Sequence, residues 1–185
     1  MEQEESSFDD VLRAARELGY VEADEALDLD GFDAAHKAVI LAYISHGLWV
    51  REGAFPIEGI RRISTEDLQA AGKLDCKVKL IAVIRRDFET EGVALGVYPA
   101  LVPMREVIAR TDGVYNGISV TGNVLGTTVL TGRGAGQDPT ASSIISDVVD
   151  AIKVILCEKP PPKLRHTSEG ICRLAAPSEV EGAFY

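Results

Sequence analysis

The sequence predicts an α+β domain whose mixed, mainly antiparallel sheet is covered by helices on one face. Two observations support this prediction. Apolar residues recur at helical spacing before residue 72 and again after residue 136, whereas the segments between them alternate apolar and polar residues with the period of a strand. The strands are short and separated by turns, which favours antiparallel or mixed pairing over a wholly parallel sheet.

Three helices are expected ahead of the sheet. The first starts close to Met1 and stops at Gly19, where a glycine is expected after a helix C-terminus. The second runs from Asp33 to His46 and is apolar over most of its circumference, so we expect it at the centre of the core. The third, from Ser64 to Gly72, opens with a capping arrangement and an acidic first turn.

Four strands follow these helices, and a glycine-rich turn ends the series. The expected strands are Val78 to Arg85, Val93 to Val97 with an end at Pro99, Val114 to Val120, and Val124 to Leu130 after a turn around Gly122 and Asn123. The turn, Gly132 to Gly136, leads into a closing helix in which Asp138 and Pro139 fit the N-cap and first-turn positions.

Composition indicates an ordinary globular chain. At 185 residues, 46% hydrophobic and 26% charged, it can form one good core. We expect one domain over residues 1–157, followed by a Pro-rich linker and C-terminal tail over 158–185. The net charge of -10 argues against nucleic acid or an anionic membrane as a partner.

Neither a membrane span nor a secretion signal is visible in the sequence. The longest purely apolar run, Ala38 to Ile44, is too short to cross a bilayer, and acidic residues follow Met1 where a signal peptide needs basic ones. The three cysteines are widely spaced and the three histidines are scattered, so we expect reduced thiols, a cytoplasmic location and no metal site.

The acidic segment from Ala15 to Lys37 is the most informative feature for function. Asp33 and Lys37 are four residues apart, so on a helix they lie on one face, where the carboxylate can hold the ammonium in a defined place. Further carboxylates precede them, and these can converge on a small cationic group. The carboxylates are Glu22, Asp24, Glu25, Asp28 and Asp30.

Two other interpretations of this segment stay open. Asp30 fits a helix N-cap, Asp33 a first-turn acid favoured by the helix dipole, and Lys37 an exposed ion-pair partner, all without any catalytic role. A calcium loop is the other interpretation, since Asp28, Asp30 and Gly31 match positions of an EF-hand. The first and last ligand positions would then be Ala26 and Lys37, which do not suit calcium.

The segment resembles the signature of homoserine dehydrogenases. The matching residues are Ala15, Gly19, Tyr20, Glu22, Asp24, Asp28, Gly31, Asp33 and Lys37, with Glu25 where the family has a proline. Further matches are Gly59, Ile60, Ile63, Asp67, Ala70, Lys79 and Leu80, then Val114 and Asn116, and finally the stretch from Gly132 to Asp147. The resemblance covers roughly residues 15–150.

This resemblance implies reversible hydride transfer between NAD or NADP and the pair L-homoserine and L-aspartate 4-semialdehyde, in threonine, isoleucine and methionine biosynthesis. Glu22 and Asp33 would hold the substrate ammonium, and Lys37 would act as a general acid or in a proton relay. Tyr20 and Asp28 are further candidates for orienting substrate. A homodimer is expected, as in relatives.

The glycine-rich turn is not a dinucleotide fingerprint, because its spacing is GxGxG and Gln137 stands where GxGxxG needs glycine. A tight turn with close helix packing would explain it equally well. The resemblance places Gly134, Ala135 and Gly136 near the nicotinamide. It also implies that the main nucleotide-binding half lies outside this chain, so alternatives are a non-catalytic dimerisation or substrate-binding module, or an acidic assembly domain.

Overall fold

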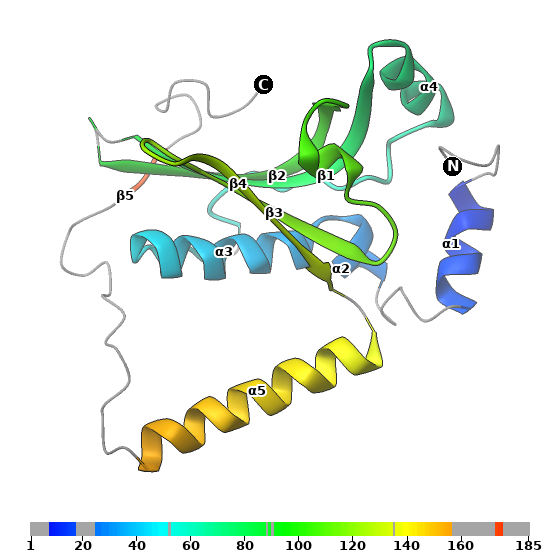
Figure 1. Ribbon diagram of the computed structural model, residues 1–185. Helices are drawn as coiled ribbons and strands as arrows, with labels where there is room; N and C mark the ends of the chain where they lie inside the picture. Colours follow the sequence, from blue (N-terminus) through cyan, green and yellow to red (C-terminus); the bar gives the residue numbers. More distant parts are fainter. Residues whose placement is uncertain are drawn as a thin grey trace.

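The computed structural model describes residues 8–17, 25–51, 53–87, 89, 91–134, 136–156 and 173–175 (Figure 1). In chain order, the elements of these residues are α1 (Phe8–Glu17), α2 (Glu25–Leu29), α3 (Phe32–His46), α4 (Thr65–Lys73), β1 (Cys76–Arg86), β2 (Gly92–Pro103), the 3-10 helix η1 (Val107–Arg110), β3 (Tyr115–Gly122), β4 (Gly126–Arg133), α5 (Gln137–Leu156) and β5 (Arg173–Leu174). The α+β prediction is confirmed, with antiparallel β1–β2 and β3–β4 pairs and one parallel contact to β5.

The larger sheet has the strand order β1–β2–β5. Strand β2 runs through Pro99 to Pro103, so the prediction that it ends at Pro99 is wrong. Val97, two residues earlier, directs both of its backbone polar groups away from β1. Pro99 has the same direction along the strand, so its missing N–H removes no hydrogen bond to β1.

A segment outside the named strands covers part of the other edge of β2. Residues 56–61, here called the strap, form a parallel bridge with β2 between Ile57 and Val97. The Val97 amide donates to the carbonyl of Pro56 over 3.0 Å, and the Glu58 amide donates to the carbonyl of Val97 over 2.8 Å. The strap therefore extends the sheet beside β2 by a single parallel bridge.

The core lies between α3 and one face of β2. Small residues on α3 allow the helix to approach the sheet closely, and Ala38 and Ala42 are fully buried. The buried cluster contains Ala35, Val39, Ala42, Leu48, Val50, Phe55, Val93, Leu95 and Val97. The predicted central position of the second helix is confirmed, and its start at Phe32 lies one residue before the expected Asp33.

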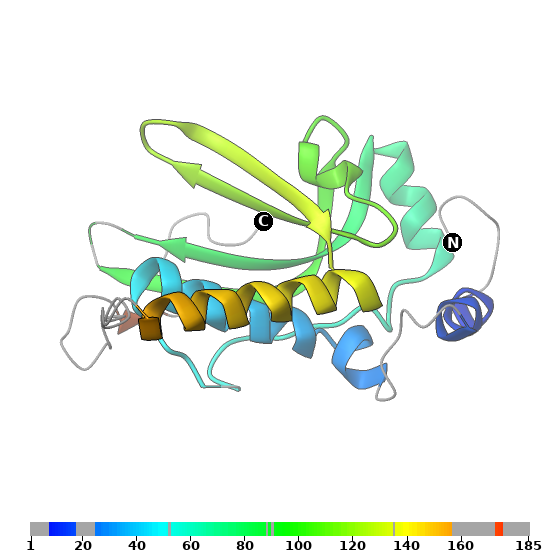
Figure 2. The ribbon, with the colours of Figure 1, turned by 60° about the horizontal axis from the view of Figure 1, so that its bottom comes forward.

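Strands β3 and β4 form a separate two-stranded sheet. Figure 2 shows this hairpin rising away from the β1–β2 sheet. The turn between the two strands occupies Asn123 to Leu125, so Val124 lies in the turn and does not start the second strand as expected. Val124 is 94% exposed, which explains why its apolar character misled the strand assignment.

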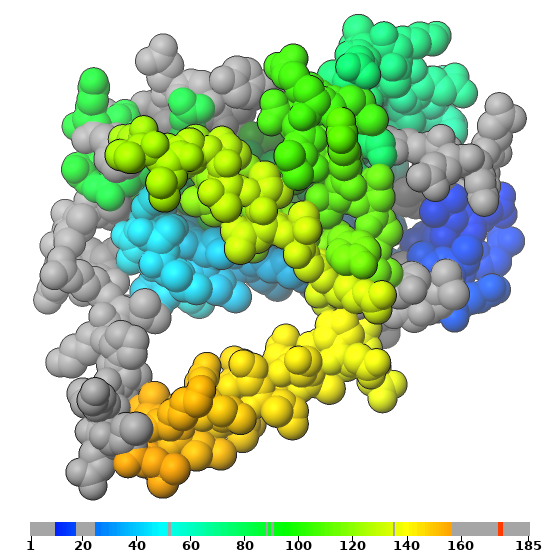
Figure 3. All heavy atoms as spheres, viewed as in Figure 1, coloured from blue at the N-terminus to red at the C-terminus, as the bar shows by residue number. Residues whose placement is uncertain are grey.

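Helix α5 stands apart from the rest of the fold. It begins at Gln137, so Asp138 lies in its first turn and the prediction that Asp138 is the N-cap is wrong. Every residue from Thr140 to Leu156 is exposed. Figure 3 shows open space between α5 and α3. Its large apolar residues Ile144, Ile145, Val148 and Ile152 are 48–64% exposed.

Candidate active site

The first turns of α3 bring together the two best candidates for catalysis. Lys37 donates a hydrogen bond from Nζ to Asp33 Oδ2 over 2.5 Å, which confirms the geometry expected for residues four apart on a helix. The Lys37 and Asp33 side chains are 56% and 50% exposed, so both remain accessible to a ligand. The arrangement offers an acceptor for an ammonium beside a proton-bearing amine.

The corner between α2 and α3, which consists of Asp30 and Gly31, orients the first turn of α3. Gly31 is the N-cap residue, with a φ of 85° that favours glycine, and it makes no side-chain capping bond. The hypothesis that Asp30 caps the helix is therefore wrong. The Asp30 Oδ1 atom instead accepts a hydrogen bond from Arg61 Nε over 2.6 Å.

The other acidic candidates are divided between described and undescribed residues. Asp28 is half-buried in the short helix α2, which ends directly before the corner. Glu25 at the start of α2 forms an ion pair with Arg16 of α1, so this carboxylate already has a cationic partner. Tyr20 and Glu22 lie outside the described residues, as does Asp24.

The glycine-rich turn lies at the end of β4, close to the same end of α3. In Figures 1 and 2 the passage from β4 into α5 lies beside the α2–α3 end of α3. Gly136 has a φ of 124°, which only glycine adopts readily, and Ala135 lies outside the described residues. The fold thus brings the start of α5 towards the α2–α3 end of α3, two elements separated by about a hundred residues in the sequence.

Asn116 of β3 is a neighbour of this turn that sequence reasoning did not assign to the site. A Cβ placed on Gly134 would lie 1.9 Å from Asn116 Nδ2 and 2.5 Å from its Cγ, so the carboxamide occupies the space of a side chain at position 134. The Gly134 amide also donates to the carbonyl of Val114 over 3.1 Å. The Val114-x-Asn116 family match could have pointed to Asn116. A sequence pattern does not show, however, that the Asn116 side chain lies beside Gly134.

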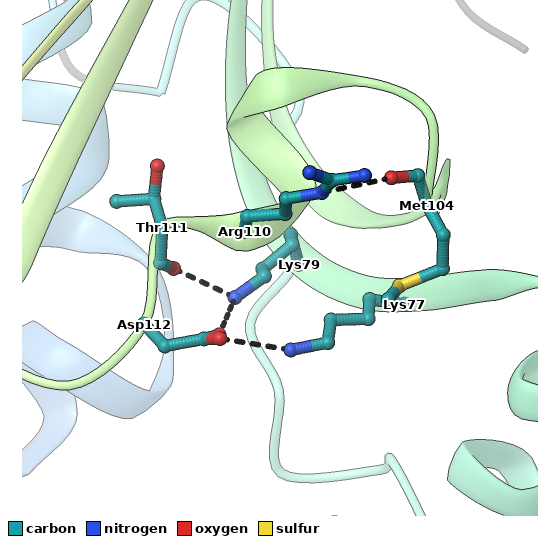
Figure 4. A network of polar contacts seen from close by, with 6 residues as sticks. All are labelled: Lys77, Lys79, Met104, Arg110, Thr111 and Asp112. Atoms are coloured by element: carbon teal, nitrogen blue, oxygen red, sulfur yellow. Dashed lines mark hydrogen bonds and ion pairs between the residues drawn. The ribbon is translucent and has the colours of Figure 1, made fainter.

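A second polar cluster fixes the start of β3. Lys77 Nζ and Lys79 Nζ donate to the two carboxylate oxygens of Asp112 over 2.9 and 2.7 Å, and Lys79 also donates to the carbonyl of Thr111 over 2.8 Å (Figure 4). These bonds hold the pKa of Asp112 below its usual value, first through Lys79 and then through Lys77. The two lysines alternate along β1, so they share one face of the sheet.

This cluster connects the larger sheet to the glycine-rich turn. Asp112 precedes β3, and β3 carries Asn116 to its contact with Gly134. The sequence placed Lys79 in a predicted strand and in the family match, and it gave no role to Asp112. The lysines on alternating positions were visible, but their shared partner is more than thirty residues away.

Two properties of the described residues bear on the class of site. Among the described residues, no group of three His, Cys, Asp or Glu side chains is placed to hold a metal ion. No helix within the described ranges has both the length and the apolar character that a membrane crossing requires.

Comparison with known proteins identifies relatives for nearly the whole chain. A protein from Synechocystis sp. named homoserine dehydrogenase is 39% identical over 191 aligned residues, which cover 100% of this chain and 44% of the relative. The homoserine dehydrogenase of Pseudomonas aeruginosa is 39% identical over 155 residues, covering 84% of this chain and 35% of its own length. The chain thus spans less than half the length of these relatives.

Solved structures agree with the sequence relatives. The crystal structure of a homoserine dehydrogenase from Thiobacillus denitrificans superimposes with a TM-score of 0.79 at 38% identity, covering 87% of this chain and 38% of that one. A hyperthermophilic archaeal homoserine dehydrogenase in complex with NADPH gives a TM-score of 0.63 at 27% identity, covering 87% of this chain and 43% of that one. A family model described as homoserine dehydrogenase matches residues 1–149, so the chain belongs to the homoserine dehydrogenase family.

Proposed function

We propose that this chain is the substrate-binding and catalytic portion of a homoserine dehydrogenase, which interconverts L-homoserine and L-aspartate 4-semialdehyde with NAD or NADP. The single observation that supports this most is the Asp33–Lys37 pair, exposed at the first turn of α3 in a chain of this family. A dehydrogenase that acts on an amino acid needs an acceptor for the substrate ammonium and a proton donor at the reacting oxygen. The pair offers both.

Lys37 is the proposed catalytic residue. In the reducing direction, the carbonyl oxygen of the semialdehyde gains a proton as its carbon gains a hydride, and an ammonium hydrogen-bonded to that oxygen can supply the proton. Asp33 lies 2.5 Å from Lys37 Nζ and keeps the amine on one side of α3. In the oxidising direction, the same amine belongs to the relay that removes the hydroxyl proton.

The acidic residues hold the substrate in the proposal. Asp33 and Glu22 accept hydrogen bonds from the substrate ammonium, where an ionised donor and acceptor give a stronger bond than a neutral pair. Asp28 and Tyr20 orient the rest of the substrate.

The nicotinamide cofactor supplies or accepts the hydride when it is bound. The glycine-rich turn is proposed to contact only one end of that cofactor, because its glycines lack the spacing of a dinucleotide fingerprint. Gly134, Ala135 and Gly136 are the proposed neighbours of the nicotinamide. The remainder of the dinucleotide is held outside this chain, where the preference between NAD and NADP is set.

The wider setting follows from the proposed reaction. Its product feeds threonine, isoleucine and methionine biosynthesis, and the proposed location is the cytoplasm. Residues 1–157 form the proposed catalytic domain, and residues 158–185 a linker and tail. The proposed assembly is a homodimer.

A binding and turnover experiment tests the function. The purified chain is titrated with L-homoserine and NADPH, alone and after addition of a separately produced nucleotide-binding half from a relative, while nicotinamide absorbance follows turnover with L-aspartate 4-semialdehyde. We expect homoserine to bind the chain alone and turnover to require the second part. Binding without turnover in the reconstituted mixture would contradict the catalytic assignment, and absence of homoserine binding would contradict the substrate site.

A further inference from the structure

The strap is attached to the most buried strand of the core. Val97 of β2 is fully buried and uses both backbone groups to bond the strap, through the Pro56 carbonyl and the Glu58 amide. Because packed protein interiors deform little, hydrogen bonds to this buried strand hold the strap in a fixed position relative to the core.

The other end of the strap contacts the corner between α2 and α3. The Ile60 amide donates to the carbonyl of Leu29 over 2.8 Å. A Cβ added to Gly59 would lie 2.0 Å from the Leu29 oxygen and 2.4 Å from the Asp30 Cα, so backbone meets backbone with no room for a side chain. Gly59 is thus the position at which the strap and the corner come closest.

The corner is also confined from the side of the sheet. A Cβ on Gly31 would lie 3.2 Å from a methyl carbon of Val97 and 3.4 Å from one of Ile57. The carbonyl of Gly31 accepts the Ala35 amide over 3.0 Å, which is the first backbone bond of α3. A small rotation of this corner would consequently turn the first turn of α3 and move Asp33 with it.

An ion pair completes the attachment. Arg61 Nε donates to Asp30 Oδ1 over 2.6 Å, linking the end of the strap to the residue before Gly31. Both side chains are partly exposed, at 45% and 36%, so this bond contributes little to the overall stability of the fold. Its two partners are 31 residues apart.

From these contacts we propose that the strap sets the position of the Asp33–Lys37 pair, with Gly59 and Arg61 as positioning residues. The proposal rests on the proposed function, since the pair is its catalytic element. Gly59 fixes the distance between strap and corner, and Arg61 fixes the orientation of Asp30. Neither residue touches substrate in this proposal.

Hydrogen exchange on the chain itself tests the mechanical part. The variants are Arg61→Ala and Arg61→Lys, with Arg62→Ala as a matched control, because Arg62 is an exposed arginine on the same turn. The reporters are the amides of Asp30, Ala35 and Ile60, and the reference amide is that of Leu68 in α4. We expect Arg61→Ala to accelerate exchange of the reporters about two- to fivefold, the range of an exposed ion pair, and Arg61→Lys to restore most of it.

Kinetics on an enzyme preparation active on homoserine tests the functional part. Arg61→Ala should lower kcat with homoserine about two- to tenfold, with the KM of the dinucleotide unchanged and partial rescue by Arg61→Lys. Gly59→Ala should act in the same direction and more strongly. If Gly59→Ala does not fold, the kcat values of the Arg61 variants alone test the proposal.

Two results would overturn the proposal. One is equal reporter exchange in Arg61→Ala and Arg62→Ala, and the other is faster exchange with unaltered kcat in the active enzyme. If the unmodified enzyme fails to turn over homoserine, the proposed function fails while the exchange data still decide whether the strap holds the corner.

Discussion

Replacing Lys37 with methionine separates a catalytic lysine from a structural one. Lys37→Met keeps an unbranched side chain of good helix propensity and removes only the charge and the proton. The pair that it breaks is an (i, i+4) contact with Asp33 whose side chains are 56% and 50% exposed. Such a pair contributes about 0.3–0.5 kcal/mol to the free energy of unfolding.

The expected effects on stability and on turnover therefore differ greatly in size. A loss of that order lowers Tm by about 1–2 °C in a chain of this length. Loss of a positioned proton donor lowers kcat by about 10²–10⁴-fold, which corresponds to about 2.7–5.4 kcal/mol in the activation barrier. The increase in the activation barrier should therefore be about five times the loss in unfolding free energy, or more.

The assay measures initial rates of nicotinamide reduction with L-homoserine for each variant mixed with the nucleotide-binding half of a relative, alongside a thermal melt of each variant alone. Lys153→Met in α5 is the matched control, because Lys153 forms a 2.9 Å ion pair with Asp150 and both side chains are similarly exposed. The control should lose little stability and no turnover. Unchanged kcat in Lys37→Met would refute the catalytic role, and an equal loss in both variants would show that the effect is not specific to Lys37.

Three further predictions concern the fold that holds the site. Leu95→Ala removes a side chain that is only 1% exposed in the core beneath α3, so denaturant titration should show a loss of about 2–5 kcal/mol. Asp112→Asn tests pH dependence: the carboxyl has a depressed pKa in the folded chain, so its contribution is present above its unfolded pKa of about 4 and is lost as pH falls through the lower folded pKa. In Asp112→Asn, the unfolding free energy should therefore depend less on pH between the unfolded pKa and the lower folded pKa of this carboxyl, and an unchanged slope in that range would contradict the assignment. Ser64→Ala removes the side-chain cap of α4 and should destabilise the chain by about 0.5–2 kcal/mol, with faster amide exchange in the first turn of that helix.

Local features of the chain were well predicted from its sequence. Ser64 and Asp67 form the expected capping box of α4, because both partners lie within one helical turn. The Asp33–Lys37 bond follows equally from helical spacing. These are contacts whose geometry is set by the backbone between the two residues.

Long-range contacts could not be predicted in the same way. Asp30 has the residue type and the sequence position expected of an N-cap. Its bond to Arg61 depends instead on where the strap meets the corner between α2 and α3. Likewise Lys77 and Lys79 meet Asp112 only after the chain passes through β2 and η1. The proposed roles of Tyr20, Glu22 and Ala135 stay predictions, since these residues lie outside the described ranges.

The isolation of α5 has a mechanical consequence for the turn that precedes it. Twenty residues at 1.5 Å each make a helix of about 30 Å, which the chain enters directly after Gly136. A change of about 10° in the direction of this helix displaces its far end by about 5 Å, from the length of the helix alone. A surface that covered α5 would therefore also constrain the backbone at Gly136 and at Gly134 beside Asn116.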